Sequence, residues 1–110
     1  MLRFRIPSRS KYGNVKTERF GQKFDSKKEA DRYLELRSLL EHGEIKNLRT
    51  QVAYPFIINA VKIATYKADF VYNDRHGNEI VEDAKGFRTR EYKIKKRLML
   101  ALYNIEIRET

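Results

Sequence analysis

Apolar residues recur at two spacings along this chain of 110 residues, and each spacing predicts a different kind of element. Steps of three and four residues, typical of one face of a helix, run from about residue 25 to 42 and from about 91 to 103. Stretches rich in Val, Ile, Tyr and Phe between turn formers predict strands at about 49–58, 62–73 and 79–85, and a short strand at 105–108. This order predicts a mixed α/β (α+β) domain, with a small mainly antiparallel sheet flanked by two helices.

The length of the chain suits one domain with a modest core, spanning residues 1–110. Residues 1–20 are polar and basic and contain glycine, so we expect an arm or loop there. This arm is either a solvated tail or a segment that grips phosphates, and the sequence leaves both interpretations open.

Several classes of protein are excluded by what the chain lacks. It has no cysteine, which removes disulfide scaffolds, thiolate zinc sites and thiol catalysis. The longest apolar stretch, residues 52–61, has ten residues and is interrupted by Pro55 and Asn59, so no membrane span is expected. The first ten residues lack the apolar core of a secretory signal, which predicts an intracellular protein.

The charge of the chain points to a polyanionic partner. Lys and Arg number 24 against 15 Asp and Glu, a net charge of +9. Such a balance favours nucleic acid, with anionic lipid as a weaker alternative. Residues 1–24 and 85–97 each carry seven basic residues and a single Glu, so the remaining chain is slightly acidic and keeps most of the carboxylates.

Glu29 is an acidic residue on the apolar stripe of the first predicted helix. It shares the face of Tyr33, Leu36 and Leu40, and a carboxylate on a buried face needs a reason. One reason is a capping box, Ser26-x-x-Glu29, in which Glu29 reaches back to the start of the helix. The other is an inward-facing carboxylate with a task of its own, and the pattern does not decide between the two.

The loop between the second and third predicted strands fixes which residues face each other. A three-residue loop at 75–77, with Gly77 in the left-handed position, pairs Asp74 with Asn78. In that register Asp69 lies directly opposite Asp83, where like charges destabilise a sheet. The four charges on this face, which include Lys67 and Lys85, either pair diagonally in solvent or hold a hard divalent cation such as Mg²⁺.

Lys85 follows Asp83 by two residues and therefore projects on the same side of the strand. From there it could orient or deprotonate a water, or offset charge on a phosphate. Gly86 next to it allows close approach of a ligand, and the second basic block begins here. This juxtaposition of acids and bases suits a bound phosphodiester backbone.

Taken together, these residues resemble the PD-(D/E)XK nuclease superfamily, and in particular small phage-encoded endonuclease-like proteins related to the Holliday-junction resolvases. The resemblance covers about residues 10–108, with two departures: Ala68 replaces the proline of the motif, and Asp83 stands where glutamate is more usual. The matching blocks are Gly21-x-x-Phe24-Asp25-Ser26-Lys27-x-Glu29-Ala30, Gly43-x-Ile45, Gln51, Tyr66-x-Ala68-Asp69-Phe70-x-Tyr72, Glu82-Asp83-Ala84-Lys85-Gly86 and Thr89-x-x-Tyr92-x-x-Lys95.

The resemblance implies a restriction-endonuclease-like core and Mg²⁺-dependent cleavage of DNA, with Mn²⁺ expected to substitute. Asp69 and Asp83 would be metal ligands, joined by Glu29 and the carbonyl of Ala84, and Lys85 would be the catalytic lysine. Two further residues have conditional roles: Glu82 is an alternative ligand if the register slips, and Gln51 either supports the site or simply caps a strand.

The expected partner is DNA, gripped by basic residues of the second block: Arg88, Arg90, Lys93 and Lys96. Related resolvases imply a homodimer and the cytoplasm of a phage-infected bacterial cell, and no interface is evident in the sequence. We therefore carry two hypotheses. The first is a metal-dependent endodeoxyribonuclease, acting on branched, junction or other DNA, and the second is a non-catalytic nucleic-acid-binding module on a nuclease-like core.

Overall fold

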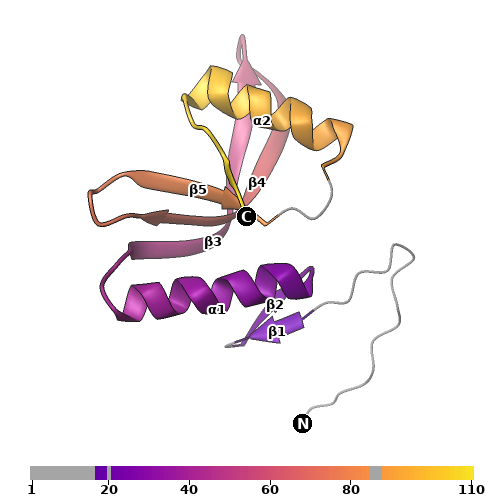
Figure 1. The fold of residues 1–110 in the computed structure, drawn as a ribbon. Helices are drawn as coiled ribbons and strands as arrows, with labels where there is room; N and C mark the ends of the chain where they lie inside the picture. The colour runs from indigo at the N-terminus through magenta and orange to yellow at the C-terminus, as the bar shows by residue number, and fades with distance from the viewer. Residues whose placement is uncertain (1–16, 20, 85–87) are drawn as a thin grey trace.

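The computed structural model describes residues 17–19, 21–84 and 88–110 as a mixed α+β fold (Figure 1). A four-stranded sheet in the order β3-β4-β5-β6 carries two helices, and a separate two-stranded hairpin lies beside the first of them. All strand pairs are antiparallel except β5 and β6, which are parallel. The elements are β1 (Thr17–Arg19), β2 (Gln22–Phe24), α1 (Lys27–Glu41), β3 (Lys46–Ile58), β4 (Val61–Asn73), β5 (Glu79–Asp83), α2 (Arg90–Tyr103) and β6 (Arg108–Glu109).

This arrangement confirms the predicted fold class and most element positions. Both helices begin at a hydroxyl cap, since Ser26 accepts a hydrogen bond from the Glu29 N–H and Thr89 accepts one from the Tyr92 N–H. The helix α2 ends at Tyr103 and is capped by Asn104, whose left-handed backbone is common at helix C-termini. The described part of the chain contains no helix long and apolar enough to cross a membrane.

The predicted hairpin register between β4 and β5 is confirmed. Phe70 pairs with Glu82 and Val71 with Val81, the offset that the three-residue loop requires. In that loop the Asp74 N–H donates to the Asn78 carbonyl at 2.9 Å, and Gly77 has a φ of 84°. Glycine is favoured there because side chains with a Cβ rarely adopt this conformation.

The hydrophobic core consists of two clusters, one under each helix. The cluster under α1 includes Phe70 and Tyr72, and the cluster under α2 includes Tyr66, Ala68 and Val71. Figure 1 shows α2 along the part of β3 and β4 nearest their shared turn, and α1 along the opposite end of the sheet. Tyr66 and Ala68, before Asp69, therefore join the cluster under α2. Phe70 and Tyr72, after Asp69, join the cluster under α1, although regular alternation would place all four on one face.

Two parts of the chain differ from the sequence-based expectation. The closing strand lies at Arg108–Glu109 rather than 105–108, because Ile105 packs against the core and Ile107 is buried in it before pairing with β5 begins. The arm predicted for 1–20 lies mostly outside the described residues. Its described part, Thr17–Arg19, is the first strand of the hairpin with β2, which sequence analysis missed.

Candidate active site

Asp69 and Asp83 occupy opposing positions at one end of the β4–β5 ladder. The ladder pairs Phe70 with Glu82 at this end, and one further step in the same register sets Asp69 across from Asp83. Asp83 is 1% exposed, and Asp69 is half-buried and accepts a hydrogen bond from the Ala84 N–H at 2.8 Å. The register thus brings two acidic residues to opposing positions, where sheets normally avoid like charges.

Asp83 is oriented by Tyr66, a residue of β4 to which sequence analysis assigned no role in the site. The Tyr66 hydroxyl donates a hydrogen bond of 2.5 Å to Oδ2 of Asp83, and both side chains are buried. Burial and the neighbouring carboxylate raise the pKa of Tyr66 far above its ordinary value, so its hydroxyl remains a donor. The only sequence signal for this role is a tyrosine three residues before Asp69 on the same strand.

Glu29 combines the two alternatives left open by the sequence. Ser26 is the helix cap, yet the Glu29 side chain is 4% exposed and accepts a hydrogen bond of 2.9 Å from Nε2 of Gln51. Burial, followed by the charges of Asp69, Asp25 and Asp83, raises the pKa of Glu29 to about 7. A hydrogen bond from the Asp25 backbone opposes this rise.

Gln51 holds Glu29 from a strained position in β3. Its neighbours Thr50 and Val52 pair with Phe70 and Ala68, which sets Gln51 across from Asp69. Its φ of 54° lies in the left-handed region, where a residue other than glycine costs about 1–3 kcal/mol. The strain coincides with the point where β4 changes from one core cluster to the other, and the supporting role of Gln51 stays a prediction.

The three carboxylates interact but do not form a ready-made ligand set. Within the described ranges, no group of three or more His, Cys, Asp or Glu side chains stands close enough to hold a metal ion. Asp69 and Asp83 nonetheless both raise the pKa of Glu29, so the three share one electrostatic environment. Carboxylate oxygens suit Mg²⁺ chemically, and binding one cation would require these side chains to move closer together. Lys85 and Gly86 lie outside the described residues.

The alternative ligand Glu82 has a different task. It is fully buried and accepts hydrogen bonds from Nε and Nη2 of Arg32 at 2.9 and 2.7 Å, and a further one from the Tyr72 hydroxyl. These donors come from α1 and β4 and hold Glu82 on the α1 side of the sheet. Because the register does not slip, Glu82 is excluded from the position of Asp83.

Comparison with known proteins matches the chain to a protein family. Residues 9–110 match a family described as "Protein of unknown function (DUF1064)". The chain belongs to this family. No curated protein and no solved structure matches the DUF1064 chain.

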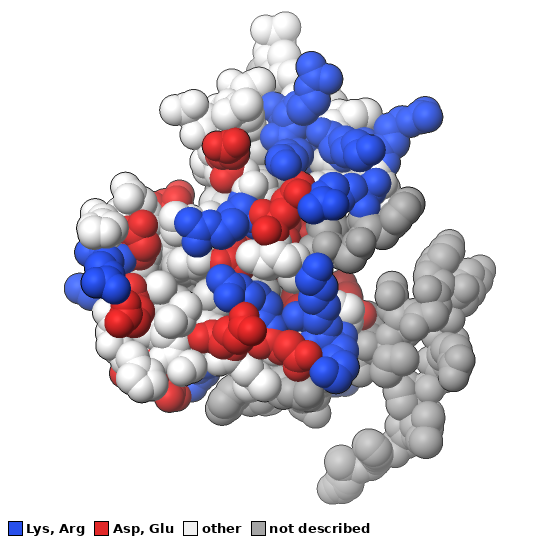
Figure 2. All heavy atoms as spheres, viewed as in Figure 1, with Lys and Arg blue, Asp and Glu red and all other residues white. Residues whose placement is uncertain are grey.

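The basic residues predicted to contact DNA fall into two groups in this DUF1064 domain. Arg90 and Lys93 are exposed on α2, and Figure 2 shows Lys and Arg side chains gathered over this helix. Arg88 and Lys96 both bind Glu109, at 2.6 and 2.9 Å, and so fasten β6 to α2 and to the segment before it. Hydrogen bonds from Lys96, Tyr92 and Arg88 lower the pKa of Glu109 to about 2.

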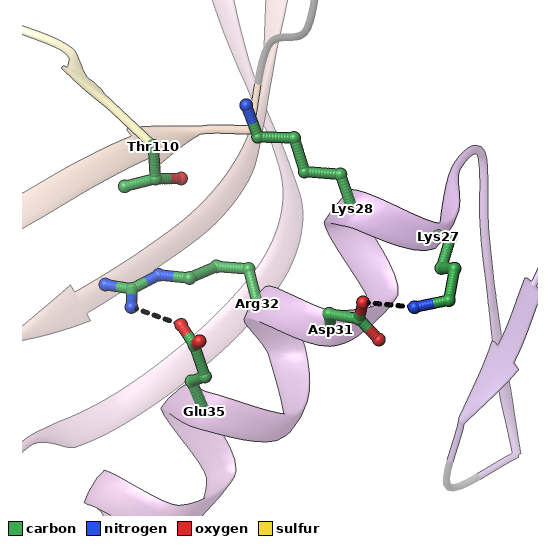
Figure 3. Close-up of a pocket in the computed structure, with 6 residues that line it drawn as sticks. All are labelled: Lys27, Lys28, Asp31, Arg32, Glu35 and Thr110. Carbon is green, nitrogen blue, oxygen red and sulfur yellow. Dashed lines mark hydrogen bonds and ion pairs between the residues drawn. The ribbon is translucent and has the colours of Figure 1, made fainter.

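A pocket of about 470 Å³ lies beside α1 (Figure 3). Lys27 is paired with Asp31 and Arg32 with Glu35, both at 2.8 Å, and Thr110 closes the other side. Its charges thus largely compensate one another.

The pKa of Glu29 predicts how the stability of the metal-free protein depends on pH. A carboxyl whose pKa is raised from 4.5 to about 7 by folding contributes full stability below pH 4.5 and loses it as pH rises to 7. We expect the free energy of unfolding in EDTA to fall by about 2–3 kcal/mol between pH 5 and pH 8. Glu29→Gln should flatten this dependence, because a neutral amide keeps an acceptor for Gln51 and has no charge to bury.

Urea unfolding at several pH values measures this effect. Glu35→Gln is the matched control, because Glu35 is exposed on the same helix. That variant should retain the pH dependence of the wild type. If the unfolding free energy of Glu29→Gln depends on pH as that of the wild type does, then a group other than Glu29 causes the pH dependence.

Proposed function

We propose that this protein is a Mg²⁺-dependent endodeoxyribonuclease that hydrolyses DNA phosphodiester bonds. The observation that carries the proposal is the opposed pair Asp69 and Asp83, with the buried Glu29 in the same electrostatic environment. A protein that buries mutually repelling carboxylates loses stability unless a cation relieves the repulsion. The net charge of +9 and the basic residues of α2 supply attraction for a polyanion.

Asp69, Asp83 and Glu29, with the Ala84 carbonyl, would hold the cation. Bound Mg²⁺ polarises a phosphoryl oxygen and makes a bound water more acidic. Tyr66 keeps Asp83 in place through its hydrogen bond, and Gln51 does the same for Glu29. Lys85, by its resemblance to the catalytic lysine of PD-(D/E)XK nucleases, would stabilise the charge that develops on the phosphate.

Branched or junction DNA in phage replication or recombination is the substrate that the resemblance suggests. A homodimer and a cytoplasmic location in the infected bacterial cell belong to the same proposal. A pair of identical sites would suit symmetric cutting of a junction.

The proposal is tested by incubating the protein with plasmid, single-stranded, duplex and four-way-junction DNA. We expect cleavage with Mg²⁺ or Mn²⁺ and none with EDTA. Without a cation, nothing lowers the pKa of the attacking water or polarises the phosphoryl oxygen. Gel electrophoresis of end-labelled substrates measures the products. Absence of cleavage on every substrate with both ions would reject the enzyme hypothesis.

A second candidate is a non-catalytic nucleic-acid-binding module. It is favoured because, among the described residues, no three carboxylates lie close enough together to hold a metal ion. Both candidates predict that binding weakens with salt, by about 0.9 in log K per neutralised phosphate for each tenfold rise in salt. They differ in their response to metal: the binding module should bind DNA equally with and without Mg²⁺, whereas the nuclease should show metal-dependent binding or cleavage.

A further inference from the structure

A pocket of about 310 Å³ lies between β4 and the start of α2, and apart from Asp83 and Tyr66 its lining has no role in the proposal so far. Asp83 forms part of its wall. Thr65 and Lys67 line it from β4, where residues two apart project on the same side. Thr89, Glu91 and Lys95 line it from the start of α2, and Glu91 and Lys95 are four apart on one helix face. Two lysine and two threonine side chains therefore line the pocket beside a candidate metal ligand.

We propose that this pocket binds a phosphate of the nucleic-acid backbone next to the one being cleaved, with Lys67 and Lys95 as its cationic contacts. The inference rests on the proposed function for the identity of the ligand, and it names a subsite of that same substrate. Ammonium groups form charge-assisted hydrogen bonds with phosphate oxygens, and the hydroxyls of Thr65 and Thr89 are neutral donors. Because the pocket lies beside Asp83, its phosphate would be a neighbour, on the same DNA strand, of the phosphate that is cleaved.

Glu91 competes with the ligand for Lys95. Its carboxylate lies 2.9 Å from the Lys95 ammonium, and the pair spans one turn of α2. The Lys95 side chain is 23% exposed and that of Glu91 is 76% exposed, so the lysine is much more enclosed than its partner. A phosphate entering the pocket takes over Lys95, and Glu91 turns to solvent. Removing Glu91 should consequently strengthen binding, the opposite of removing either lysine.

The experiment measures binding of a fluorescent oligodeoxynucleotide duplex by anisotropy, with Ca²⁺ in place of Mg²⁺ so that a cation is present without cleavage. Thermal unfolding verifies the fold of each variant. We expect Lys95→Ala and Lys67→Ala each to weaken binding roughly tenfold, and Glu91→Gln to tighten it about threefold. Lys62→Ala removes the same charge from an exposed position at the β3–β4 turn and should change binding less than about twofold. Lys95→Ala should also reduce the slope of log K against log salt by about one.

Equal effects of Lys95→Ala and Lys62→Ala, weaker binding by Glu91→Gln, or no binding by the wild type would each overturn the subsite. Its failure is distinguishable from failure of the nuclease. If the wild type cleaves DNA while the lysine variants bind and cleave normally, the nuclease stands without this subsite. If nothing is cleaved but the variants shift binding as expected, the pocket stands as a phosphate site of a binding module.

Discussion

Asp83→Asn is expected to lower the rate of DNA cleavage by at least about 100-fold while leaving the fold intact. An amide oxygen binds a divalent cation much more weakly than a carboxylate does, so the site would lose a charge that it needs. The Asn side chain has the same shape, and its oxygen can still accept the hydrogen bond from Tyr66. Single-turnover cleavage rates with Mg²⁺ and Mn²⁺ measure the effect, and circular dichroism measures the fold.

The matched control is Asp31→Asn, which removes the same charge from α1. Asp31 pairs with Lys27 on the exposed side of the helix, so this variant should cleave DNA at close to the wild-type rate. Cleavage by Asp83→Asn at the rate of Asp31→Asn would contradict the assignment of Asp83 as a metal ligand. It would leave the protein without an identified catalytic carboxylate on β5.

The features that could be predicted from sequence are those set by local chemistry. The loop Arg75–Gly77 fixes the β4–β5 register, because a glycine in the left-handed position allows a three-residue turn of one geometry. That register in turn sets Asp69 opposite Asp83 without any knowledge of the rest of the fold. The helix starts at Ser26 and Thr89 follow equally from capping.

The remaining features depend on contacts between distant segments. Neither the capping box nor a free inward-facing carboxylate describes Glu29 on its own. Its partner Gln51 lies in another element and has an unusual backbone conformation, which the local pattern around Glu29 does not report. Nothing in the pattern of β4 distinguishes Tyr66 from Phe70, yet the sheet directs them into different clusters and only Tyr66 reaches Asp83. Hydrophobic periodicity reports which side chains are buried, and it does not report which cluster receives them.

Glu82 depends most strongly on a distant partner, and this gives the second large expected effect. Arg32, fifty residues away, is its cationic partner and binds both carboxylate oxygens. Arg32→Ala would leave a fully buried carboxylate without a counter-charge, which typically costs about 3–5 kcal/mol of unfolding free energy. Urea unfolding at pH 7 measures this cost. The stability of Arg32→Lys should lie between those of the wild type and Arg32→Ala, because a lysine retains the charge but cannot form the bidentate contact.

Two comparisons separate the buried ion pair from a general effect of altering α1. Lys27→Ala breaks an exposed pair on the same helix and should cost at most about 0.5 kcal/mol. The double variant Arg32→Leu/Glu82→Leu removes both charges, and it should be less destabilised than Arg32→Ala because no buried charge remains. If Arg32→Ala costs no more than Lys27→Ala, then Glu82 is not held by Arg32 in solution. In that event the Tyr72 hydroxyl, on the same side of the sheet, would be the remaining partner of Glu82 that the structure shows.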